Sequence, residues 1–173
     1  MQDPFSQLMD EHRVIEQVLD ALEAATLREV PIAFYEQALD FAAEFADGYH
    51  HAKEEERLFT YLEERGMPRD YGPLGVMVQE HDVGRAHIRA MRAYLADGDI
   101  PSLRQESLAY ALLMRNHIAK EDEVLFPMGR AMLTADEIAE IQRGFDTVPE
   151  PSPSAADYVE RAASLLALVT ESP

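Results

Sequence analysis

The sequence contains no cysteine among its 173 residues. Disulfide bonds, iron–sulfur clusters and thiolate zinc sites are therefore excluded. No apolar run is long enough to cross a membrane. The first residues also lack the basic segment and apolar core of a secretory signal. We therefore expect a cytoplasmic protein.

Basic residues are scarce: the sequence has 15 Lys and Arg but 33 Asp and Glu, so its net charge is -18. A nucleic-acid partner requires a basic patch that meets phosphates, and an anionic membrane has the same requirement. Neither partner is expected. Solvated helix faces account for most of the acids, so the informative ones are those that repeat at metal-ligand spacing.

Apolar residues recur at helical spacing, and no alternating strand pattern is found in the sequence. Turn signals divide the chain into four long helices. The first begins at Pro4 and ends near Thr26, and the second begins at Pro31 and ends at Gly66. The third ends near Gly98, and the fourth begins at Pro101. This pattern predicts an all-α protein, an antiparallel four-helix bundle over residues 1–133. Residues 134–173 are expected to form a C-terminal helical extension, with helices capped by Thr134 and Ser154, that packs on the bundle or on a partner chain.

All six histidines fall inside the four predicted long helices, at least one on each: His12, His50, His51, His81, His87 and His117. Histidine is a common metal ligand, and side chains from four facing helices can converge on a bundle axis. A single histidine of this kind is more often a core or surface residue, so the distribution over four helices is what favours a metal site. His87 is out of phase with His81 and is expected to lie outside it.

A repeated block supports this interpretation. The second helix reads HHAKEEERLF from residue 50, and the fourth reads HIAKEDEVLF from residue 117. Each copy places a histidine four residues before a glutamate, His50 before Glu54 and His117 before Glu121, so both side chains lie on one helix face. Two such pairs supply two imidazoles and two carboxylates, and a carboxylate can bridge two cations.

Spacing alone does not identify the ligands on the second helix, because His51 and Glu55 have the same spacing as His50 and Glu54. The repeated block decides between the two pairs. His51 aligns with Ile118 of the fourth helix, which is not a metal ligand. We therefore take His50 and Glu54 as ligands, and His51 and Glu55 as neighbours outside the ligand set.

The first and third helices add His12 and His81, each on an apolar face. Glu16, four residues after His12, has the spacing of a further ligand, but we interpret it as a group that orients an imidazole or pairs with a cation. The corresponding residue after His81 is Arg85, whose charge repels a metal ion. We hypothesise an ion pair between Arg85 and Glu16 across the bundle.

The segments EHR…IE, HHAKEE…LF, EHD…GR and HIAKEDEVLFP, within residues 5–130, resemble the hemerythrin-like, His-His-Glu cation-binding domains. The resemblance implies a non-haem centre of two iron ions with the ligands His12, His50, Glu54, His81, His117 and Glu121, both glutamates acting as bridges. Oxygen-carrying hemerythrins have a further histidine where this chain has Arg85. Their fourth-helix carboxylate is an aspartate five residues after its histidine, whereas Glu121 is four after His117. These departures argue against simple reversible oxygen carriage.

The function expected is binding or sensing of dioxygen, peroxide or nitric oxide, or buffering of iron. Five apolar residues are expected around the open coordination positions: Leu8, Ile15, Leu58, Met114 and Leu125. Two alternatives stay open: an enzyme that decomposes hydrogen peroxide, and a scaffold whose metal only holds the helices together. Zinc or manganese can occupy such ligands as well. A homodimer through the last helix is a further expectation.

Overall fold

The computed structural model, described over residues 3–170, is helical and contains no strand in that range. Its elements are α1 (Pro4–Ala25), α2 (Ile32–Asp40), η1 (Phe41–His51), η2 (Glu54–Leu58), α3 (Phe59–Glu64), α4 (Gly72–Asp97), α5 (Ile100–Lys120), η3 (Glu121–Leu125), α6 (Phe126–Met132), α7 (Ala135–Phe145) and α8 (Ala155–Thr170). The segments named η have the wider turn of a π-helix. They continue the neighbouring α-helices, so α2–α3 and α5–α6 each form one long helix.

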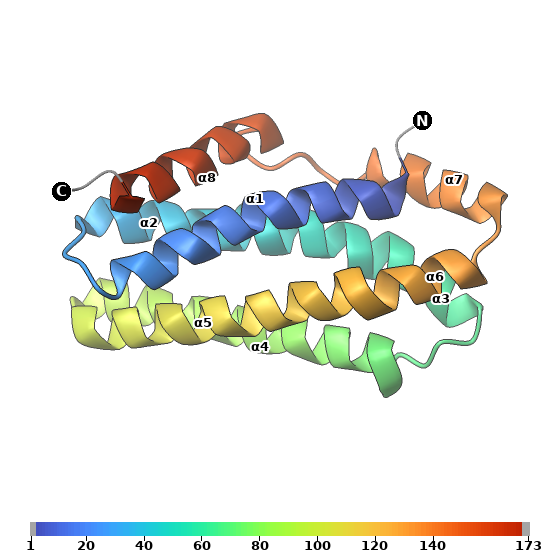
Figure 1. Cartoon of the computed structure of the whole chain (residues 1–173), viewed down its shortest axis with the longest axis horizontal. Coiled ribbons are helices and arrows are strands. Elements are labelled where there is room, and N and C mark those ends of the chain that lie inside the picture. The colour runs from blue at the N-terminus through green and yellow to red at the C-terminus, as the bar shows by residue number, and fades with distance from the viewer. Residues whose placement is uncertain (1–2, 171–173) are drawn as a thin grey trace.

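The four long helices α1, α2–α3, α4 and α5–α6 lie side by side and antiparallel (Figure 1). The predicted all-α bundle with additional C-terminal helices is confirmed. Capping explains two of the helix starts, because Asp3 accepts a hydrogen bond from the Ser6 backbone N–H and Asp99 from that of Ser102. Gly98 ends α4 with a φ of 71°, a left-handed conformation that glycine adopts without a Cβ clash.

Helices α7 and α8 cover the side of the bundle formed by α1 and α2–α3, away from α4 and α5 (Figure 1). The predicted capping box is present at α7, where Thr134 and Glu137 each bind the backbone N–H of the other. Helix α8 buries four apolar side chains: Tyr158, Ala162, Leu165 and Val169. A dimer through this helix stays a prediction, and it would have to use the outer face of α8.

A layer of buried polar side chains interrupts the apolar interior. Among the described residues, one apolar cluster includes Leu8 and Leu58, and a second includes Ile15 and Phe45. Near the boundary between these clusters fall the buried polar residues His12, His50, His51, Lys53, Glu54, His81, His117 and Glu121. The fold therefore brings the predicted ligands to one level of the bundle.

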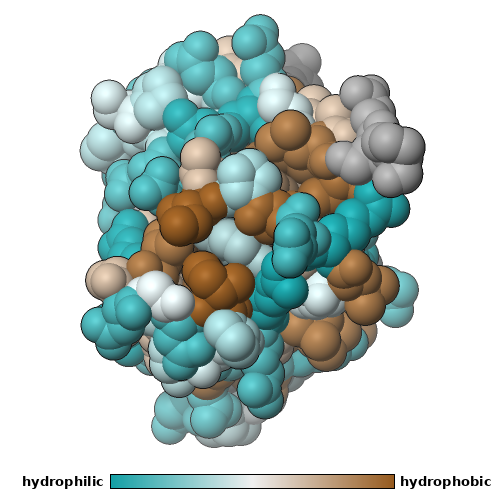
Figure 2. Space-filling model, turned by 90° about the vertical axis from the view of Figure 1, so that its left-hand side faces the viewer, coloured by the Kyte–Doolittle hydropathy of each residue, from teal (hydrophilic) through white to brown (hydrophobic). Residues whose placement is uncertain are grey.

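The end of the bundle near the α1–α2 connection is partly apolar. Leu27 is 87% exposed and Ile32 is 56% exposed. Figure 2 views this end and shows apolar side chains gathered inside a hydrophilic rim. The buried polar layer is not part of this surface. Of the helices in the described range, none is long and apolar enough to cross a membrane.

Candidate metal centre

Seven buried side chains of the described range converge in two clusters that share Glu54. The first cluster comprises His12, His50, Glu54 and Glu121, and the second comprises His51, Glu54, His81 and His117. Within each cluster, one potential ligand atom of every residue lies within 4.8 Å of the others. Every one of these residues is at most 3% exposed. The six predicted ligands thus lie together, and their ligation stays a prediction.

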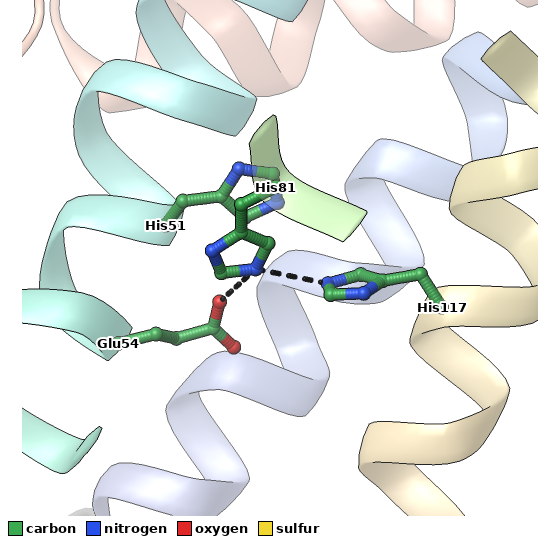
Figure 3. A group of neighbouring side chains, drawn as sticks. All are labelled: His51, Glu54, His81 and His117. Atoms are coloured by element: carbon green, nitrogen blue, oxygen red, sulfur yellow. Dashed lines mark hydrogen bonds and ion pairs between the residues drawn. The ribbon is translucent and has the colours of Figure 1, made fainter. Parts of the chain in front are cut away.

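Glu54 lies between the two clusters. Its Oε1 is 3.5 Å from Nε2 of His50, and its Oε2 is 3.5 Å from Nε2 of His81. Figure 3 shows the second cluster, in which the Glu54 carboxylate approaches the His81 ring and His117 reaches toward it from α5. The two carboxylate oxygens therefore face different clusters, as a carboxylate that bridges two cations requires.

Glu121 approaches both clusters as well, because its Oε2 lies 3.2 Å from Nε2 of His12 and 3.3 Å from Nε2 of His117. Six buried atoms of the centre have no hydrogen-bond partner: Nε2 of His12 and His51 and both carboxylate oxygens of Glu54 and Glu121. Leaving buried polar atoms unpaired costs folding free energy. Imidazole nitrogens and carboxylate oxygens suit divalent cations such as iron, zinc and manganese, so the residues present fit a metal site.

The position of His51 differs from the prediction. The alignment of His51 with Ile118 predicted that only His50 of the two is a ligand. In the structure η1 is π-helical up to His51, and this ring belongs to the second cluster. Ile118, its counterpart in the repeat, lies in the regular α-helix α5 and packs in an apolar cluster. The wider turn of η1 therefore accompanies the additional histidine, in line with the frequent use of π-helical turns at functional sites.

Each of the five clustered histidines has a carboxylate at Nδ1. The pairs are His12 with Asp122 at 2.7 Å, His50 with Glu11 at 2.9 Å, His51 with Asp47 at 3.3 Å, His81 with Glu55 at 2.6 Å, and His117 with Glu80 at 3.1 Å. A carboxylate at Nδ1 fixes the tautomer and the ring orientation, and it raises the basicity of the other nitrogen. Every Nε2 is thereby left for the interior of its cluster.

Four of these five outer carboxylates follow the internal repeat. The pair Glu11–His50 corresponds to Glu80–His117, and Asp122–His12 corresponds to Glu55–His81. The centre thus has an approximate internal twofold relation between the first and third helices and between the second and fourth. Of these acids only Glu55 was singled out from the sequence. The Glu-His dipeptides at residues 11–12 and 80–81 were the available signal for two others.

The remaining residues singled out in the sequence lie outside the two clusters. Glu16 pairs with Arg13 at 2.8 Å, so the predicted ion pair between Glu16 and Arg85 is wrong. Arg85 has three carboxylate partners: Asp47, Glu55 and Asp82. It points toward η1 and η2 because two of these acids lie there. His87, expected outside the site, pairs with Glu106 at 2.7 Å.

Burial and charge move the pKa values of the clustered groups in different directions. Burial, with the charge of Glu121 next in effect, raises the pKa of Glu54 well above its ordinary value. Burial lowers the pKa of His50 to about 4. Burial also lowers the pKa of His117, but the nearby carboxylates of Glu121 and Glu80 have the larger effect and raise this pKa to about 9. A cation that binds here must therefore displace bound protons.

Buried histidine and carboxylate clusters between the helices of a four-helix bundle are typical of metal-binding helical domains. Residues 3–129 match the hemerythrin HHE cation binding domain, and the chain belongs to that family. The resemblance found in the motifs is thereby confirmed. Three uncharacterized proteins, one of Mycobacterium bovis and two of Mycobacterium tuberculosis, are 27% identical to it over 150 residues. The alignment covers 80% of this chain and 58% of each relative, so the chain spans little more than half their length.

Proposed function

We propose that the two clusters hold two iron ions and that this centre binds or senses dioxygen, peroxide or nitric oxide. Cation binding is the property of the family. The observation that carries the proposal is the set of unpaired buried oxygens on Glu54 and Glu121, which face members of both clusters. One cation in each cluster would satisfy these atoms.

The ligand set supports iron and leaves room for a small ligand. Each cluster offers four protein residues, fewer than the ligands of an octahedral ion. Bound iron supplies the electrons and the vacant coordination positions that small oxidants and nitric oxide require. Five imidazoles and two carboxylates make a nitrogen-rich set, and imidazole is a common ligand of iron.

Apolar residues within four positions of the clustered residues in the sequence are buried, which favours a small ligand. The five apolar residues expected here, Leu8, Ile15, Leu58, Met114 and Leu125, are all at most 1% exposed. Phe126 stacks on His12 with ring centroids 5.5 Å apart, and Phe59 stacks on His81 at 5.7 Å. These phenylalanines end the two copies of the repeated block, so the stacking accounts for the phenylalanine in each copy. The rings shield the clusters from water.

The outer carboxylates favour a resident metal over iron buffering. A buffer must release its iron readily, whereas all five histidines here are held at Nδ1 and buried. Outer partners of this kind commonly strengthen metal affinity by about 10- to 100-fold. Such a centre is built to retain its ions.

Anaerobic reconstitution with Fe²⁺, followed by metal analysis and optical spectra before and after dioxygen, peroxide or nitric oxide, tests the proposal. We expect two irons per chain and a stable spectral change with at least one of these ligands. The double substitution His50→Ala and His117→Ala should abolish iron binding, while His87→Ala serves as the matched control. Absence of iron binding by the unaltered protein contradicts the proposal. Steady oxygen release from peroxide would instead assign the enzymatic alternative.

A further inference from the structure

Arg85 connects the outer carboxylates of two histidines in the second cluster. Its Nε donates to Oδ1 of Asp47 at 2.9 Å, and its Nη2 donates to Oε1 of Glu55 at 2.6 Å. The same two oxygens lie 3.3 Å from Nδ1 of His51 and 2.6 Å from Nδ1 of His81. One guanidinium therefore holds both acids that orient these rings. A planar fork of donors allows this, and the single ammonium group of lysine cannot reproduce it.

The two histidine rings held by these acids also contact each other directly. The His51 and His81 rings are stacked, with centroids 3.8 Å apart and planes 16° from parallel. The rings come from different long helices, so their stacking depends on how each is held from outside. Asp47 and Glu55 supply that support, and Arg85 fixes the two acids relative to each other. The directions of both Nε2 atoms are thus coupled through one residue.

The first cluster is supported in a different way. Its two outer carboxylates have separate cations: Asp122 pairs with Arg13, and Glu11 pairs with Lys53. The residue four after His12, at the position equivalent to Arg85, is Glu16, and its partner is Arg13. The Arg85 connection therefore belongs to the second cluster alone.

We propose that Arg85 is a positioning residue that holds His51 and His81 on one cation and so sets the affinity of the second metal position. The first position, built on His12 and His50, does not depend on it. This inference rests on the proposed two-cation function. Arg85 itself touches no cation, and it acts through the two carboxylates.

Titration of the metal-free protein with Co²⁺, followed by calorimetry and visible absorption, tests this role. The variant is Arg85→Gln and the matched control is Arg115→Gln, because Arg115 also pairs with two acids, Asp20 and Glu23, away from the centre. We expect the unaltered protein and the control to bind two Co²⁺ ions. In Arg85→Gln one ion should bind as before and the other about 10- to 100-fold more weakly. Arg85→Lys should show a similar selective loss, since it keeps the charge without the fork.

A second measurement separates positioning from general stability. Long-range ¹H–¹⁵N spectra of histidine side chains in the metal-free protein should change for His51 and His81 in Arg85→Lys, and stay unchanged for His12 and His50. Equal weakening of both Co²⁺ ions, or a titration identical to that of the Arg115 control, overturns the positioning role. Failure of the unaltered protein to bind Co²⁺ overturns the two-cation function together with it. Two ions bound equally well by all variants overturn only the role of Arg85.

Discussion

At the residue scale, the centre is marked by buried carboxylate oxygens that have no hydrogen-bond partner. Glu54 and Glu121 are fully buried, and their carboxylate oxygens have no hydrogen-bond donor. By contrast, the Nδ1 atoms of the clustered histidines are all engaged by carboxylates. Orientation is therefore provided from outside each cluster, and the inner atoms are left for cations.

His51 should be required for the second metal position. We expect His51→Ala to lower cation binding from two ions per chain to one, because the second cluster then keeps only three of its four residues. His87→Ala should leave binding unchanged, since His87 pairs with Glu106 outside both clusters. Isothermal titration of metal-free protein with Fe²⁺ under anaerobic conditions measures both stoichiometries. Two ions retained with unaltered affinity by His51→Ala would show that this ring is not a ligand.

Cation binding should release protons and depend on pH. The pKa of His117 is raised from 6.5 to about 9, because Glu121 and Glu80 outweigh the opposing effect of burial. The metal-free protein therefore keeps this proton at neutral pH. Its contribution to folding stability is complete below 6.5 and is lost as the pH rises through about 9. Apparent cation affinity should change in the opposite sense and increase from pH 6.5 to about 9. Calorimetry in two buffers of different ionisation enthalpy measures the release, and equal heats in both buffers would contradict it.

Predictability from sequence also differs from residue to residue. The pairs His50–Glu54 and His117–Glu121 could be found because four-residue spacing on an α-helix fixes a shared face. His51 could not, because its counterpart in the repeat is Ile118 and the local π-helical turn leaves no periodic signal. The partner of Arg85 could not be found either. Opposite charges occur on every helix, and only the packing of α4 against η1 selects among them.

At the element scale, the long helices and their ends follow from local signals. Asp3 and Thr134 cap α1 and α7 as their sequences predict, and Gly98 ends α4. The π-helical segments η2 and η3 occupy equivalent places in the repeated block, whereas η1 has no counterpart in α5. This difference between the second and fourth helices is where the internal twofold relation breaks and where the additional histidine enters.

Helix α8 should contribute to the stability of the bundle through one face. Leu165 is fully buried there, and Leu168 on the same helix is 51% exposed. We expect Leu165→Ala to lower the free energy of unfolding by about 2–5 kcal/mol, because a buried leucine leaves a cavity when truncated. Leu168→Ala should change it by less than about 0.5 kcal/mol, as exposed substitutions usually do. Urea unfolding followed by circular dichroism compares the two. Similar values for both variants would mean that α8 is not held on α1 and α2 in solution.

At the scale of the whole molecule, the centre lies between two apolar clusters. Those clusters occupy the two ends of the bundle, and α7 and α8 extend them along one side (Figure 1). The net charge of -18 favours the approach of cations and opposes compaction of the metal-free chain through self-repulsion. Both effects weaken as salt screens the charges. We therefore expect stability and cation binding to be linked.

Metal removal should destabilise the protein without unfolding it. Ligands that bind only the folded state stabilise it by about 4 kcal/mol when their concentration is about 1,000 times the dissociation constant. The apolar clusters on both sides of the centre keep the metal-free helices packed, while unpaired buried oxygens on Glu54 and Glu121 weaken them. We expect chelation to lower the melting temperature and to leave the helical circular dichroism at 25 °C unchanged. Restored Fe²⁺ should reverse the shift. Loss of the helical signal on chelation would instead support the scaffold alternative, in which the metal alone holds the four helices together.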